Sequence, residues 1–218
     1  MVYHIGIDEA GRGPVIGPMV VAGIIIEDKK EKEIEDLGAK DSKLVLPSKR
    51  RELSELFKKK FAYTIQELTP KEIDDGTNLN HLEAQKMAMV INELSQETDE
   101  EIVAFVDCPS ISVRKWVEYL ETFLIDRKRI KIVAEHKADA KYPVVSGASI
   151  IAKERREELI AELKKEFHVD FGSGYPSDPK TSLFIKENYN NPIFKDFIRH
   201  SWASVKRLHK KGEQERLF

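Results

Sequence analysis

The chain has 218 residues, of which 41% are hydrophobic and 34% are charged, a composition typical of a folded protein with a charge-rich surface. Its formal net charge of −2 argues against a protein that coats nucleic acid through bulk electrostatics, so any such contact would have to be local. Cys108 is the only cysteine, which excludes an internal disulfide and a thiolate metal site and favours a reducing, cytoplasmic location.

Two apolar runs rich in β-branched residues open the chain, and a loop rich in glycine and proline separates them. These patterns predict strands over residues 2–7 and 19–26. Apolar residues at helical spacing then predict a helix over residues 47–60, and alternating polarity predicts a strand over residues 61–68.

The second half of the chain is predicted to alternate between helix and strand. Asn80 is expected to cap the helix that follows it. A continuous apolar run that ends at Asp107 predicts a strand buried on both faces. The predicted elements are helices over residues 81–95, 113–124 and 144–167, strands over residues 102–106 and 130–134, a loop over residues 172–179, and short helices beyond it.

The longest uncharged run, residues 14–26, is 13 residues long and is interrupted by glycines and a proline. A helix that crosses a membrane needs about 20 apolar residues. Residues 1–5 lack the basic start and apolar middle of a signal peptide. We therefore expect no membrane association.

Five strands and several helices, without any internal repeat, predict an α/β fold in which helices cover a sheet. We expect a core over residues 1–170, followed over residues 171–218 by a loop and a helical C-terminal extension.

Acidic residues follow the apolar runs that we predict as strands. Asp8 and Glu9 come directly after the first run, Asp107 follows the run at residues 102–106, and Asp139 lies shortly after the last predicted strand. If the strands predicted over residues 2–7 and 102–106 are parallel neighbours, the carboxylates that follow them meet at one edge of the sheet. A single acid at a strand end is more often a turn or capping residue, but their recurrence favours a Mg²⁺ or Mn²⁺ site.

The loop at residues 8–14, Asp-Glu-Ala-Gly-Arg-Gly-Pro, places two glycines around an arginine. Glycine leaves backbone that a sugar or phosphate can approach closely, although the same residues also suit an ordinary turn. The glycine spacing matches neither a Walker loop nor a dinucleotide-binding loop, so the sequence does not favour a nucleotide cofactor.

Six segments of the chain, in the same order, resemble the ribonuclease HII family, and the archaeal branch most closely. The opening loop is the first, and the last reads Gly-Ser-Gly-Tyr-Pro-Ser-Asp-Pro. The segments are residues 8–14, 41–43, 106–107, 134–143, 146–153 and 172–179.

The resemblance implies a ribonuclease H fold, with a mixed five-stranded sheet flanked by helices. It also implies that Asp8, Glu9, Asp107 and Asp139 bind two divalent ions, either Mg²⁺ or Mn²⁺. The implied activity is an endonuclease that hydrolyses the RNA strand of RNA/DNA hybrids and cuts at ribonucleotides embedded in duplex DNA. The products would carry 5′-phosphate and 3′-hydroxyl ends. Residues 1–170 would then be the catalytic core, and residues 171–218 would bind substrate.

The resemblance assigns recognition of the ribose 2′-hydroxyl to Gly11, Arg12 and Gly13 together with Tyr175, and phosphate contacts to Lys43 and Lys153. Without it, Tyr175 would be interpreted as a loop anchor packed on the core. A surface or helix-dipole role remains open for the two lysines.

The C-terminal region is basic, because residues 199–211 carry five arginines and lysines and no acid. This pattern fits either contact with nucleic acid or a solvated helix face. The tail at residues 214–218 resembles a shortened sliding-clamp-binding motif, and a frayed terminus would look the same. We expect a monomer.

Two other functions are consistent with parts of this pattern. A phosphatase or phosphotransferase that uses Asp8 as a nucleophile would need an Asp-x-Asp loop, which Glu9 and Ala10 do not supply. A non-catalytic hybrid-binding module would leave the acids unexplained, because carboxylates repel phosphate.

Overall fold

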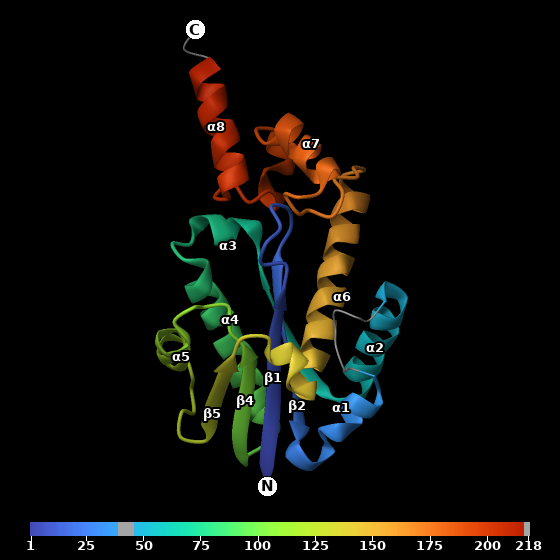
Figure 1. Ribbon diagram of the computed structural model, residues 1–218, viewed down its shortest axis with the longest axis vertical. Helices are drawn as coiled ribbons and strands as arrows, with labels where there is room; N and C mark the ends of the chain where they lie inside the picture. The colour runs from blue at the N-terminus through green and yellow to red at the C-terminus, as the bar shows by residue number, and fades with distance from the viewer. Residues whose placement is uncertain (39–45, 216–218) are drawn as a thin grey trace. The chain divides into compact units, whose positions relative to one another are not determined.

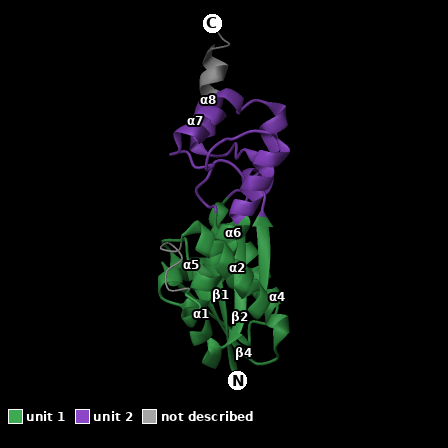
Figure 2. Ribbon diagram, turned by 90° about the vertical axis from the view of Figure 1, so that its right-hand side faces the viewer, with its two compact units in different colours: residues 1–10, 20–67, 78–155 green, residues 11–19, 68–77, 156–218 purple. Residues whose placement is uncertain are grey.

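The computed structural model describes residues 1–38 and 46–215, with side chains through residue 209. The chain forms two compact units (Figure 2). Unit 1 consists of Met1–Ala10, Val20–Glu67 and Asn78–Arg155, and unit 2 of Gly11–Met19, Leu68–Thr77 and Arg156–Phe218. The division expected at residue 170 concerns the roles of the two parts and stays a prediction.

A five-stranded mixed sheet lies at the centre of unit 1 (Figure 1). The strand order is β3-β2-β1-β4-β5. β1 pairs antiparallel with β2 and parallel with β4, and β4 pairs parallel with β5. The α/β fold with a mixed five-stranded sheet is thus confirmed. The strands are β1 (Val2–Ala10), β2 (Met19–Glu27), β3 (Ala62–Leu68), β4 (Glu101–Asp107) and β5 (Ile130–Glu135).

The first strand is longer than predicted, and this moves two acids from a loop into the sheet. Parallel pairing with β4 ends at Ile7 and Val106, but antiparallel pairing with β2 continues to Ala10. Asp8 and Glu9 therefore lie within β1, beyond the end of its parallel neighbour. The expectation that they follow the strand was wrong, because β2 supplies hydrogen-bond partners that a local pattern does not reveal.

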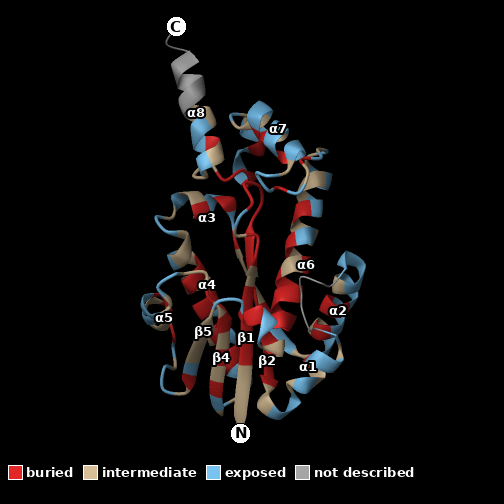
Figure 3. Cartoon of the chain, viewed as in Figure 1, coloured by how far each residue is buried: buried red, intermediate tan, exposed pale blue. Residues whose placement is uncertain are grey.

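Helices cover both faces of this sheet (Figure 3), and two glycines show how closely. A Cβ atom on Gly6 would lie 2.2 Å from the carbonyl carbon of Val144 in α6, and one on Gly23 would lie 2.4 Å from Val90 Cγ1 in α4. α6 therefore packs against one face and α4 against the other. The α-helices with residues in unit 1 are α1 (Lys32–Asp36), α2 (Pro47–Lys60), α4 (Leu79–Leu94), α5 (Val113–Glu121) and α6 (Pro143–Glu166).

Unit 2 has its own hydrophobic core, to which the C-terminal region contributes. Buried residues from the loop after β1 pack against buried residues from the end of α6 and from the segment beyond it. Its remaining helices are α3 (Pro70–Asp75), α7 (Pro179–Asn188), the short η4 (Pro192–Phe197) and α8 (Ala203–Glu215). The core residues are Val15, Ile16, Ile160, Phe171, Ile185, Phe194, Phe197, Ile198 and Val205.

Two local predictions differ from the structure. The N-cap of α4 is Asn78, whose side chain accepts a hydrogen bond from Asn80 N, so the predicted cap at Asn80 was wrong. The helix α3 was not predicted, although Thr69 and Glu72 form a capping box around its first turn. α3 is only 6 residues long, too short to show apolar periodicity. Within residues 1–38 and 46–215, none of the helices is both long and apolar enough to cross a membrane.

The close contact between β1 and α6 gives a direct test of the packing. Gly6→Ala should lower the free energy of unfolding by about 2 kcal/mol or more, because the added methyl group meets helix backbone that has no room to move. Gly13→Ala is the matched control, since its Cβ would lie 3.6 Å from the nearest atom, Tyr175 Cε1. Urea denaturation of both variants provides the measurement, and equal stability of Gly6→Ala and wild type would contradict the packing.

Candidate metal centre and substrate-binding loop

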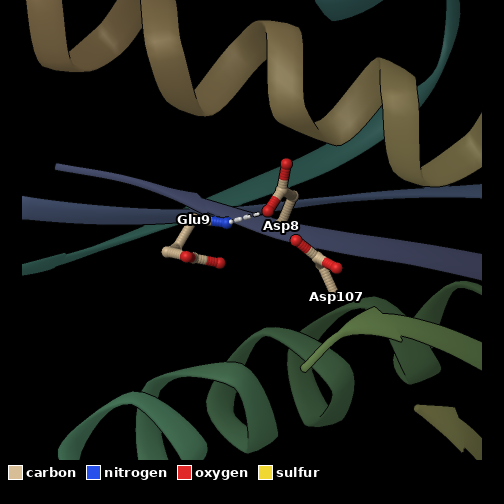
Figure 4. A group of neighbouring side chains, drawn as sticks. All are labelled: Asp8, Glu9 and Asp107. Carbon is tan, nitrogen blue, oxygen red and sulfur yellow. Dashed lines mark hydrogen bonds between the residues drawn. The ribbon is translucent and has the colours of Figure 1, made fainter. Parts of the chain in front are cut away.

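The pairing of β1 with β4 brings three acids together. Ile7 and Val106 are the last parallel pair, so the residues that follow, Asp8 and Asp107, come side by side (Figure 4). Glu9 joins them, and one carboxylate oxygen from each of the three acids lies within 4.8 Å of the others. Oxygen donors at this spacing match the preference of hard divalent cations such as Mg²⁺ and Mn²⁺.

Asp8 is the most enclosed of the three acids, with 4% of its surface exposed. The backbone N–H of Glu9 donates to Asp8 Oδ1 over 2.7 Å. Burial raises the pKa of Asp8 well above its ordinary value, the charge of Glu9 raises it further, and Asp107 adds a smaller effect. A hydrogen bond with Ser149 of α6 acts in the opposite direction. A cation at this position would relieve the repulsion between the carboxylates.

Asp107 is held by the turn that contains Asp139. The backbone N–H of Ala138 donates to Asp107 Oδ1 over 2.9 Å. Asp139 is buried in the same short helix, η3 (Ala138–Ala140), but it is not part of the group formed by Asp8, Glu9 and Asp107 among the described residues. The structure therefore gathers three of the four expected acids and places the fourth next to the residue that fixes Asp107. The role of Asp139 as a ligand stays a prediction.

Of the two lysines expected to hold phosphates, the structure describes only Lys153, and the role of both stays a prediction. Lys153 is half-buried on α6, one helical turn after Ser149 and thus on the same face of the helix. Lys43 lies outside the described residues. Cys108 is buried, and its carbonyl oxygen lies 2.7 Å from His136 Nδ1.

The glycine loop belongs to unit 2, and there it is close to Tyr175. Gly11 has a φ of 87°, and a Cβ at this position would lie 2.5 Å from the side chain of Arg156, so the loop requires glycine. Val15 N donates to Gly174 O over 2.8 Å, which ties the loop to the residue before Tyr175. Tyr175 is 40% exposed, and its ring centroid lies 5.4 Å from the Arg156 guanidinium. This exposure does not fit a residue packed entirely into the core.

Sequence reasoning missed the residues that support this site. Ser149 falls inside one of the family-like segments, but a serine in an apolar helix carries no signal of its own. Arg156 is only 3% exposed, whereas its position in the charged part of α6 suggested an exposed residue. Both residues act through contacts with segments distant in the sequence, which local patterns do not encode.

Metal-free Asp8→Asn protein should be more stable than wild type at neutral pH. Because the folded pKa of Asp8 is raised above 3.8, its stabilising contribution is present at low pH and is lost as the pH rises above that value. The stability gap should therefore widen as the pH rises from about 4 toward neutral. Thermal midpoints in chelator provide the measurement.

Asp126→Asn is the matched control, because the pKa of the half-buried Asp126 is lowered by its hydrogen bond with Arg129. That substitution should not stabilise the protein at neutral pH. Equal or lower stability of Asp8→Asn at neutral pH would show that the carboxylates do not repel one another as described.

Comparison with known proteins connects this geometry to a family. The family model for ribonuclease HII matches residues 5–205. A ribonuclease HII from Pyrococcus furiosus is 41% identical over 206 residues, which cover 93% of this chain and 89% of the relative.

Solved structures agree with the family match. The crystal structure of ribonuclease H2 from Pyrococcus horikoshii superimposes with a TM-score of 0.83 at 36% identity, covering 96% of this chain and 98% of that one. A structure described as the complex of PCNA with ribonuclease HII from Archaeoglobus fulgidus gives a TM-score of 0.80 at 38% identity, covering 92% and 95%. The chain belongs to the ribonuclease HII family and is an endoribonuclease that hydrolyses phosphodiester bonds.

Proposed function

We propose that this endoribonuclease cuts the RNA strand where ribonucleotides pair with DNA, including single ribonucleotides embedded in duplex DNA. We also propose that it does so with two divalent metal ions and leaves 5′-phosphate and 3′-hydroxyl ends. The observation that carries the proposal is the group formed by Asp8, Glu9 and Asp107 at the end of the β1 and β4 pairing. Membership of the ribonuclease HII family, whose members cleave the RNA of RNA/DNA hybrids, supports the choice of substrate.

The donor set fits Mg²⁺ or Mn²⁺. Asp8, Glu9 and Asp107 offer only oxygen ligands, and the Cys108 thiol is not part of this group. When bound, two such ions would lower the pKa of the attacking water and neutralise charge on the leaving 3′ oxygen. The Asp8 and Asp107 carboxylates are held by Ser149, the Glu9 amide and the Ala138 amide, which fixes their oxygens before a cation arrives. Asp139 is proposed as the fourth ligand.

Recognition of the substrate is proposed for unit 2 and for the lysines. The backbone of Gly11, Arg12 and Gly13 would sense the 2′-hydroxyl, and the exposed ring of Tyr175 would stack on the sugar after the ribonucleotide. Lys153 and Lys43 would hold phosphates. The exposed Lys206 and Arg207 of α8 would add salt-dependent attraction.

A clamp contact through the tail is a further part of the proposal. The Archaeoglobus fulgidus structure described as a PCNA complex shares the fold and supports it. The tail residues that would make the contact lie outside the described side chains. In other respects the enzyme is proposed to act as a monomer.

Asp107→Asn tests the metal site. Cleavage of a duplex with one ribonucleotide, measured with Mg²⁺, should fall by more than about a hundredfold, because residues that merely support metal ligands already cost up to that much. Wild type should lose activity when chelator is added. Asp126→Asn is the control, since Asp126 precedes the start of β5, whereas Asp107 lies at the end of its parallel neighbour β4.

The same assay separates the alternatives. Binding without cleavage by wild type would indicate a hybrid-binding module, and release of phosphate alone would indicate a phosphatase. Activity of Asp107→Asn close to that of wild type would refute the metal site.

Tyr175→Phe and Tyr175→Ala should behave differently. Phenylalanine keeps the ring, whereas alanine removes a stacking contact of about 1 to 3 kcal/mol by analogy with base stacking, which corresponds to about tenfold to a hundredfold. The loss should be larger on a single embedded ribonucleotide than on an all-RNA strand. The ratio of kcat/KM on the two substrates provides the measurement. An unchanged ratio with a lowered thermal midpoint would make Tyr175 a structural anchor.

A further inference from the structure

Arg199 is a fully buried arginine whose side chain binds the backbone of the glycine loop. Its exposed fraction is 0%. Nη2 donates to Gly11 O over 2.7 Å, Nη1 to Arg12 O over 3.1 Å, and Nε to Gly17 O over 2.9 Å. All of these residues belong to unit 2. The charge run in the sequence suggested a solvated or nucleic-acid-binding arginine, and the structure shows that Arg199 faces neither solvent nor a surface.

Trp202 completes the set of contacts. Its indole Nε1 donates to Gly13 O over 3.3 Å, and its ring lies 5.0 Å from the Arg199 guanidinium. The carbonyl oxygens of the three consecutive residues Gly11, Arg12 and Gly13 thus all accept hydrogen bonds from the side chains of Arg199 and Trp202.

These bonds set the direction of the loop amides. In a trans peptide group the N–H points opposite to the C=O, and the described chain contains no cis peptide bond. Because the Gly11 and Arg12 carbonyls point toward Arg199, the N–H groups of Arg12 and Gly13 point away from it. If one of these peptide groups were rotated by half a turn, its carbonyl oxygen would replace its N–H on the side facing away from Arg199. The orientation therefore decides whether the loop can donate to a hydroxyl oxygen.

The segment that carries Arg199 is itself anchored. Asp74 of α3 accepts hydrogen bonds from His200 N at 2.7 Å and Ser201 N at 2.8 Å. Arg199 N donates to Val15 O over 2.9 Å. Burial, and then the charge of Arg156, lowers the pKa of Arg199 to about 9, so the guanidinium remains charged at neutral pH. Burying a charged side chain costs folding free energy, and an apolar side chain of similar volume would avoid that cost. We therefore look for a role of Arg199 in its hydrogen bonds to the loop.

We propose that Arg199, assisted by Trp202, is a positioning residue that fixes Gly11, Arg12 and Gly13 in the orientation that recognises a ribose 2′-hydroxyl. Arg199 therefore controls the selectivity for ribonucleotides more than the rate of bond cleavage. This inference rests on the proposed function, because it assumes that the loop contacts the ribose.

Two variants test the inference. Arg199→Lys keeps a positive charge but replaces the planar fork by a single ammonium, which cannot bind three carbonyls in the same geometry. Trp202→Phe removes only the donor to Gly13 O and keeps the ring beside Arg199. Trp202 is half-buried, so this milder variant serves if Arg199→Lys fails to fold.

Arg129→Lys is the matched control. Arg129 also donates to three backbone carbonyls, those of Ser95, Thr98 and Glu100, but it lies in unit 1, just before β5. Its replacement should lower the thermal midpoint without any effect on how the sugar is recognised.

The measurement compares the affinity for a duplex with one ribonucleotide with that for the same duplex made only of DNA, with Ca²⁺ in place of Mg²⁺ to limit cleavage. The ratio of the two Kd values should fall about tenfold in Arg199→Lys, which cannot keep all three bonds to the loop carbonyls, and less in Trp202→Phe, which loses one bond. Arg129→Lys should keep the wild-type ratio. With Mg²⁺, KM for the ribonucleotide duplex should rise while kcat at saturation stays within about threefold of wild type.

The outcomes are distinguishable. If wild type itself does not distinguish the two duplexes, the proposed function fails. If wild type distinguishes them and both variants keep the full ratio, with only a lowered midpoint as in Arg129→Lys, Arg199 is a structural residue and the inference is overturned.

Discussion

The parallel pairing of β1 with β4 is the constraint on which the rest of the structure depends. The pairing ends at Ile7 and Val106, immediately before Asp8 and Asp107. The spacing of neighbouring strands therefore fixes the distance between the backbones of these two acids. Gly6 lets α6 approach β1 so closely that Ser149 reaches Asp8. The position of the carboxylates is therefore a consequence of backbone pairing and helix packing, and little of it is left to side-chain rotation.

Each unit holds like charges close together around at least one buried charged group, and each arrangement costs folding free energy. In unit 1 the carboxylates of Asp8, Glu9 and Asp107 repel one another, and in unit 2 the guanidinium groups of Arg156 and Arg199 do so. Such sites persist when neighbouring residues hold the charged groups in place. Their charge must also be compensated, either by a ligand of opposite charge or by hydrogen bonds to the backbone. We infer that the acids are prepared for cations, whereas the Arg199 guanidinium is already satisfied by backbone carbonyls.

The sequence allowed all five strands and the long helices to be predicted, because apolar periodicity reports which side of an element is buried. The acids were predicted because they recur after apolar runs and because carboxylate oxygens are the ligands that Mg²⁺ and Mn²⁺ prefer. Apart from the N-cap of α4 and the short α3, what failed depended on pairing or contact between segments distant in the sequence. The continuation of β1 through Asp8 and Glu9 depends on β2, and the bonds from Arg199 to Gly17, Arg12 and Gly11 span 182, 187 and 188 residues. A run of basic residues at residues 199–211 contained no sign that its first member is buried.

The central claim is that Asp8, Glu9 and Asp107 hold the divalent ions, and diffraction from crystals grown with Mn²⁺ and a ribonucleotide-containing duplex tests it most directly. Anomalous scattering locates manganese independently of the protein coordinates. We expect two peaks roughly 4 Å apart, with ligands from these three acids and with Asp139 on one of the ions. Manganese bound elsewhere, or no peak beside Asp8 and Asp107 while substrate is in place, would contradict it.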